Sequence, residues 1–174
     1  QFIGKLDSLF TADSKLEGES TSVDISGLIG QYAHGNEPSH HIAHLYNYVG
    51  QPWRTQEIVD EVLHTLYFNN PDGLSGNEDC GQMSAWYILN AMGFYQVCPG
   101  KPVYSIGRPL FNEATVHLKD GKSFKVIAHN NSRDNKYVRS IVLNGNKLET
   151  PFFTHQDIVD GGTLELTMGS EPLK

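Results

Sequence analysis

The sequence predicts an α+β protein of more than one domain, in which a helical first part is followed by an antiparallel β part. Apolar residues recur at helical spacing up to about residue 98, and alternating patterns rich in branched residues follow Pro99. Two hairpin-turn signals also lie in the second part. A length of 174 residues allows one ordinary domain or two small ones. We therefore expect one unit over residues 1–98 and another over 99–174, joined by the stiff connector Cys98–Pro102.

Three stretches of the first part have clear helix signals, and a shorter one opens the chain. The opening stripe predicts a helix over residues 2–10. Ser39 suits an N-cap for a helix that ends at Gly50. Pro52 suits the first turn of the next helix, which runs to about Tyr67. A further helix is expected over residues 81–92, ending at Gly93. Helices joined by polar loops favour a helical bundle or a toroid.

The second part has strand signals at four places. Segments 115–118 and 123–128 flank Asp120-Gly121, a strong type I′ hairpin signal. Segment 138–143 leads into Asn144-Gly145, a second such turn, and segment 163–168 alternates as a last strand. This pattern predicts an antiparallel sheet or half of a β-sandwich.

Composition excludes several classes of protein. Apolar residues make up 39% of the chain, which is near the globular average and rules out a disordered or collagen-like chain. No stretch is apolar enough for a membrane span. With 13 basic and 20 acidic residues the net charge is −7, which argues against a nucleic-acid surface. Cys80 and Cys98 leave open one disulfide or two buried thiols.

Four of the eight histidines lie between His34 and His44, around a loop that runs into a predicted helix. A helix N-terminus favours carboxylate groups, and Glu37 lies there with Asn36 beside it. Capping by Ser39 and Glu37 is the simplest interpretation. Calcium is a second, because Asn36 and Glu37 supply the oxygen ligands that this ion prefers. Zinc bound by His40 and His44 is a third and weaker one, because the Glu of the metalloprotease motif is replaced by His41.

A second constellation spans residues 73–86, where two adjacent carboxylates lie between glycines just before a helix. Glu78 and Asp79 point in different directions, so one could hold a ligand while the other acts as a base. The purely structural alternative makes Asp79 an N-cap with Gln82 three residues later. Trp86 is expected in the core more readily than under a sugar ring. Two carboxyl groups flanking a bond are what glycoside hydrolysis needs.

Both stretches, Gly35–Ala43 and Gly76–Trp86, resemble glycoside hydrolase family 92. The resemblance extends to Asp24–Ala33, Gly93–Tyr95 and Met168-Gly169, and so covers nearly the whole chain. The members of this family are calcium-dependent, exo-acting α-mannosidases that invert configuration. The resemblance implies the last helices of an (α/α)6 toroid followed by a β-sandwich segment, as the C-terminal part of a longer enzyme.

The resemblance also implies roles for individual residues. Asp79 matches the general base. The expected calcium ligands are Glu37 and Asn36. The expected substrate contacts are Asn77, Glu78, His40 and His41. The family's general acid lies in a Glu-Gly-Asn-Ala-Trp-Gln stretch that this sequence does not contain. The expected partners are therefore a mannose-containing glycan and the remainder of the parent enzyme, in a periplasmic, cell-surface or secreted location. The alternative is a non-catalytic carbohydrate-binding or structural module.

Overall fold

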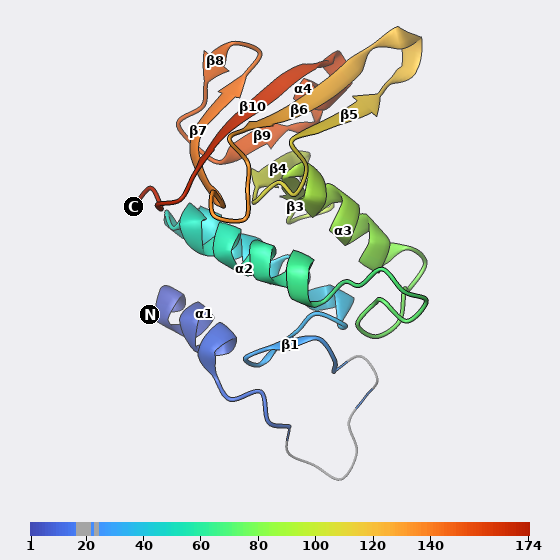
Figure 1. Cartoon of the computed structure of the whole chain (residues 1–174), viewed down its shortest axis with the longest axis vertical. Coiled ribbons are helices and arrows are strands. Elements are labelled where there is room, and N and C mark those ends of the chain that lie inside the picture. The colour runs from blue at the N-terminus through green and yellow to red at the C-terminus, as the bar shows by residue number, and fades with distance from the viewer. Residues whose placement is uncertain (17–21, 23–24) are drawn as a thin grey trace.

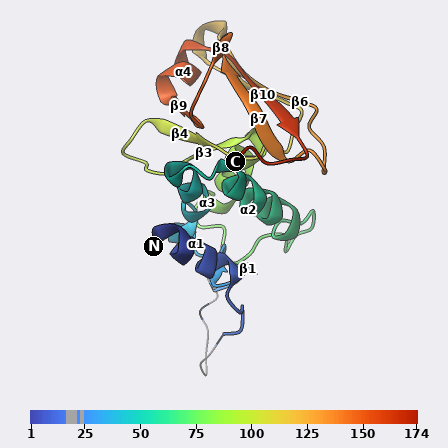
Figure 2. The ribbon, with the colours of Figure 1, turned by 90° about the vertical axis from the view of Figure 1, so that its left-hand side faces the viewer.

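The computed structural model describes residues 1–16, 22 and 25–174. The helices that precede residue 93 gather at one end of the molecule and a five-stranded sheet lies at the other, with a three-stranded sheet between them (Figures 1 and 2). The predicted mixture of a helical part and a β part is confirmed. The toroid and the sandwich stay expectations drawn from the resemblance. Within the described residues, no helix is long and apolar enough to cross a membrane.

The helical elements follow the sequence signals closely, with one difference in type. They are α1 (Phe2–Thr11), the 3-10 helices η1 (Glu37–Ser39) and η2 (Ile42–Val49), α2 (Pro52–Thr65) and α3 (Gln82–Met92). The expected α-helix before Gly50 is therefore a 3-10 helix, and Ser39 is not its cap. The Ser39 hydroxyl bonds backwards instead, to the carbonyl oxygen of Ala33 at 2.8 Å.

One predicted helix start and two predicted helix ends are confirmed. Pro52 is the first residue of α2, where its missing N–H costs no hydrogen bond. Gly50 and Gly93 close η2 and α3 with φ values of 74° and 103°, in the left-handed region that glycine adopts without strain. These helices share one core with the ribbon formed by β1 (Leu28–Ile29) and β2 (Tyr32–Ala33).

The three-stranded sheet crosses the expected domain boundary. It consists of β3 (Phe94–Gln96), β4 (Val103–Ile106) and β9 (Phe152–Thr154), all antiparallel. Because β3 precedes the connector at 98–102 and β4 follows it, the strand pair joins the two parts directly. None of these three strands was expected, since each is short and lacks clear alternation.

The five-stranded sheet has the order β5-β6-β10-β7-β8. Its strands are β5 (Glu113–His117), β6 (Ser123–His129), β7 (Tyr137–Leu143), β8 (Asn146–Lys147) and β10 (Gly162–Gly169). The expectation of a purely antiparallel sheet is wrong, because β10 runs parallel to β6. A parallel neighbour needs a crossover, and here the chain passes from β6 through β7, β8, β9 and the short helix α4 (His155–Asp160) before it returns as β10.

Both hairpin turns are confirmed. Asp120 and Gly121, in the 3-10 turn η3 (Lys119–Gly121), have φ values of 60° and 73°. Asn144 and Gly145 have φ values of 50° and 80°. A type I′ turn requires positive φ at both central residues, so these turns set the register of β5 with β6 and of β7 with β8.

Polar side chains of α2 connect the helical part to the five-stranded sheet. The Gln56 amide oxygen accepts a hydrogen bond from the backbone N–H of Val138 at 3.1 Å. Asp60 forms an ion pair with Arg108 at 2.9 Å, and both side chains are almost fully buried. Cys80 and Cys98, by contrast, are free thiols on the surface, so neither expectation for the cysteines holds.

Candidate active site

The two loops singled out in the sequence lie against each other. Gly76 is so close to Gly35 that a Cβ on Gly76 would lie 3.1 Å from the Gly35 carbonyl oxygen. A Cβ on Gly27 would lie 2.6 Å from the Ser75 hydroxyl. These glycines have positive φ as well, so they permit both the turn and the close approach. The fold thus brings the loop of Glu37 beside the loop of Asp79.

Trp86 lies beneath this junction and is fully buried. Its indole N–H donates to the carbonyl oxygen of His40 at 3.0 Å, from α3 to the other loop. The expectation that Trp86 belongs to the core is confirmed, and within this chain its ring presents no face to a sugar.

Buried histidines form the inner wall of the junction. His34 lies between the hydroxyl groups of Tyr32 and Tyr67, at 2.8 and 2.7 Å, and stacks on His40 at 4.6 Å between ring centroids. Burial, and then the nearby His40, lower the pKa of His34 to about 3. Burial also lowers the pKa of His40, although its hydrogen bond to the His34 carbonyl opposes the shift. Both rings are therefore neutral at pH 7, where this wall carries no charge.

The zinc alternative gains no support from the structure. The ring nitrogens of His44 bond to Ser105 and Asn90, at 3.1 and 2.8 Å, and burial lowers its pKa to about 4. Both ring nitrogens of His40 also have protein partners. Across the described residues, no three His, Cys, Asp or Glu side chains gather where they could hold a metal.

A hollow of about 420 Å³ opens in front of this wall. It is lined by Glu37, Pro38, His40, His41, Gln82, Tyr95, Gln96, Val97 and Pro99. The Glu37 Oε1 atom is buried and has no hydrogen-bond partner among the described groups. A buried carboxylate oxygen without a partner is costly unless a cation or donor meets it. Glu37 is thus suited to a cation, with the exposed amide of Asn36 next to it.

Asp79 is exposed and has a φ of 44°, followed by Cys80 at 57° and Gly81 at 89°. Three successive left-handed residues make a tight turn, which is strained at the two that are not glycine. The expectation that Asp79 caps α3 is wrong, because α3 begins at Gln82 and Gly81 occupies its N-cap position. Glu78 accepts hydrogen bonds from the backbone N–H and the hydroxyl of Ser84, both at 2.9 Å.

The predicted site residues therefore fall into two groups. Glu37 and His41 line the hollow and Asn36 is exposed next to Glu37, whereas Asn77 and Asp79 are exposed on the adjoining loop. His40 and Glu78 have structural contacts instead. His40 is 1% exposed, and both carboxylate oxygens of Glu78 accept hydrogen bonds from Ser84. Gln82 and Tyr95 were missed as site residues, although Tyr95 lies in the Gly93–Tyr95 motif.

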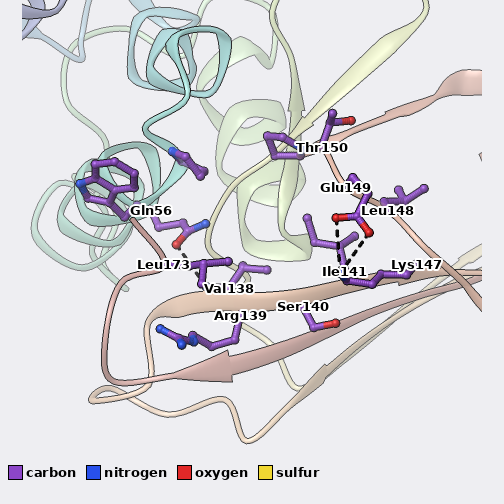
Figure 3. Close-up of a pocket in the computed structure, with 13 residues that line it drawn as sticks. Gln56, Val138, Arg139, Ser140, Ile141, Lys147, Leu148, Glu149, Thr150 and Leu173 are labelled. Atoms are coloured by element: carbon purple, nitrogen blue, oxygen red, sulfur yellow. Dashed lines mark hydrogen bonds and ion pairs between the residues drawn. The ribbon is translucent and has the colours of Figure 1, made fainter.

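A second hollow, of about 160 Å³, lies between the start of α2 and strands β7 and β8 (Figure 3). Gln56, Val138, Arg139 and Ile141 contribute to its walls, and Leu173 near the C-terminus closes one side. None of the predicted site residues is among those that line it. Of the predicted site residues, Glu37, His40 and His41 line the hollow of about 420 Å³ instead.

Comparison with known proteins decides the family. Residues 1–170 match the model of the glycosyl hydrolase family 92 catalytic domain. The chain belongs to glycoside hydrolase family 92.

Solved structures of family 92 enzymes have the same fold as this chain. An α-mannosidase from Bacteroides thetaiotaomicron in complex with mannoimidazole is 44% identical, with a TM-score of 0.92 over 99% of this chain and 22% of its own. An inverting mannosidase from the same organism is 43% identical, with a TM-score of 0.81 over 98% of this chain and 24% of its own.

A curated family relative comes from the fungus Arthroderma benhamiae and is described as an uncharacterized secreted glycosidase. It is 31% identical over 140 residues, which is 79% of this chain and 18% of the relative. The chain thus spans less than a quarter of the length of these relatives.

Proposed function

We propose that this chain forms part of the catalytic site of an inverting, calcium-assisted α-mannosidase that releases terminal α-linked mannose from glycans. One observation carries the proposal: Asp79 is exposed on a left-handed turn beside the loop of Glu37. These two adjacent loops occur in a chain of family 92 that is 43–44% identical to α-mannosidases.

Asp79 is the proposed general base. In an inverting glycosidase, one carboxylate draws a proton from water while an acid on the other side of the bond protonates the departing oxygen. Asp79 is exposed, so water has access to its carboxylate. The sequence lacks the stretch that carries the family's general acid, so in this scheme the acid comes from outside this chain.

Glu37 and Asn36 are the proposed calcium ligands. The buried Oε1 atom of Glu37 lacks a protein partner among the described groups, which is the state expected of a ligand oxygen. Calcium takes about 6–8 oxygen ligands, so two residues supply only part of the set. When bound, the ion would hold the sugar's hydroxyl groups and favour a distorted ring. Glu37 is the first residue of η1, and this helix would position its carboxylate for the ion.

The substrate contacts are proposed for Asn77 and His41, which are the accessible members of the predicted set. His40 and Glu78 would position the two loops through their hydrogen bonds to His34 and Ser84, without contact to the sugar. The glycan and the remainder of the parent enzyme are the proposed partners. Export to the periplasm, cell surface or medium is also proposed, in line with the relative described as secreted; cell fractionation would check it.

The second candidate is a carbohydrate-binding or structural module without catalysis. The observation that favours it is the missing general-acid stretch. Under this alternative the complete protein binds mannose but does not hydrolyse mannosides.

The test is mannose release by the complete enzyme that carries this chain, followed by proton NMR. We expect β-mannose as the first anomer formed from an α-mannoside, because inversion places the attacking water on the opposite face. The same reaction in excess calcium chelator should stop. Release of the α-anomer first would contradict inversion. Full turnover in the chelator would contradict the proposed role of calcium. Mannose binding without any release would favour the module.

A further inference from the structure

A short chain of hydrogen bonds links Glu37 to Asp79. The backbone N–H of His40 donates to the Glu37 carbonyl oxygen at 3.0 Å, and the backbone N–H of Gln82 donates to the Asp79 carbonyl oxygen at 3.2 Å. Between them, the Gln82 side-chain nitrogen lies 3.1 Å from His40 Nδ1. A single contact between two side chains therefore ties the proposed calcium loop to the turn of the proposed base.

The direction of this contact is fixed by its neighbours. His40 Nε2 lies 2.9 Å from the carbonyl oxygen of His34, which can only accept, so Nε2 carries the proton. The Nδ1 atom of the neutral ring must then accept, and the Gln82 amide donates to it. The same amide donates to the Tyr95 hydroxyl oxygen at 3.1 Å. Both donor positions of the amide are thus used, one for each partner.

The surroundings of this bridge are buried and hydrogen-bonded. His40 is 1% exposed, and its carbonyl oxygen accepts from the indole of Trp86. A second tie runs beside the first, because the Tyr67 hydroxyl bonds to His34 and donates to the carbonyl oxygen of Met83 at 3.1 Å. Only the first tie ends at the backbone of both Glu37 and Asp79.

We propose that Gln82 is a positioning residue, whose bond to His40 sets the place of the Asp79 turn relative to the loop of Glu37. The inference rests on the proposed mannosidase function. It assigns to Gln82 an effect on the chemical step that is separate from the folding of α3. Misplacement of a reacting group by about 1 Å costs on the order of 100-fold in rate, so a small movement of the turn is enough to be measured.

The test uses Gln82→Met in the complete enzyme that carries this chain, because Met has a similar length and no donor. We expect kcat to fall by about 10- to 100-fold with KM changed by less than about 3-fold. The reason is that the position of the Asp79 carboxylate affects proton removal from water in the chemical step more than the binding of the sugar. Hydrogen exchange should become faster at the amides of His40 and Gln82 and stay unchanged in β10. Gln82→Asn, whose amide sits on a shorter stem, should show the same pattern and serves if Gln82→Met does not fold.

Gln156→Met is the matched control, because Gln156 is exposed on α4 and far from both loops along the chain. It should leave kcat and the exchange of both amides at wild-type values. Wild-type kcat and His40 exchange in Gln82→Met would overturn the proposal. So would a loss of activity that follows the folded fraction, with faster exchange everywhere. If the wild-type enzyme releases no mannose, the proposed function fails first, and unchanged exchange in Gln82→Met would show that the bridge is absent too.

Discussion

Glu78 and Asp79 are adjacent carboxylates with different surroundings. Both oxygens of Glu78 accept hydrogen bonds from Ser84, the third residue of α3, whereas Asp79 is exposed in a left-handed turn. Two acids in different environments can take different roles, one structural and one chemical. The sequence indicated that their roles differ, but the alternative that made Asp79 the N-cap of α3 is wrong, since Gly81 holds that position. The reason is the left-handed turn over residues 79–81, which delays the first residue of α3 to Gln82.

Removal of the Glu78 carboxylate should destabilise α3. We expect Glu78→Ala to lower the free energy of unfolding by about 1 kcal/mol, the typical cost of losing a side chain that accepts a hydrogen bond from an amide in the first turn of a helix. Chemical denaturation measures it, with Glu61→Ala on an exposed position of α2 as the control. Equal stability of the two variants would show that the contacts to Ser84 contribute nothing.

At the scale of elements, the sequence predicted what depends on local signals. Pro52, Gly93 and the Asp120-Gly121 turn mark their positions by their own backbone preferences, and the structure confirms all three. The parallel pairing of β10 with β6 could not be predicted, because it depends on a crossover through α4. A capping box at Thr154 and Asp157 marks the start of α4, and it is a signal that the sequence did contain.

The buried ion pair between α2 and the residues before β5 should hold the helical part on the β part. Arg108→Met removes the nearest partner of the buried Asp60 carboxylate, which keeps Arg133 at 3.4 Å and His64 at 3.2 Å, so we expect a loss of about 1–3 kcal/mol in the free energy of unfolding. Arg139→Met, an exposed substitution of the same type, should cost far less. Urea denaturation compares them. Similar midpoints for both variants would contradict this role for the pair.

At the scale of the whole molecule, the site lies where loops from distant parts of the helical region meet. The sequence predicted both loops, and Gly27 and Gly76, where a Cβ would lie 2.6 and 3.1 Å from the nearest neighbouring atom, allow the close approach. The bridge through Gln82 could not be predicted, because its partners lie 42 and 13 residues away along the chain. The chain spans less than a quarter of its family 92 relatives, so catalysis is proposed for the complete enzyme.

The most direct test of this account is the turnover of Asp79→Asn in the complete enzyme. Asp120→Asn is the matched control, because Asp120 is also an exposed aspartate with positive φ. Loss of a general base costs about 10²- to 10⁴-fold in rate, so mannose release by Asp79→Asn should fall at least 100-fold while its thermal stability matches the control. Turnover within a few-fold of the control would contradict the assignment of Asp79 as the base.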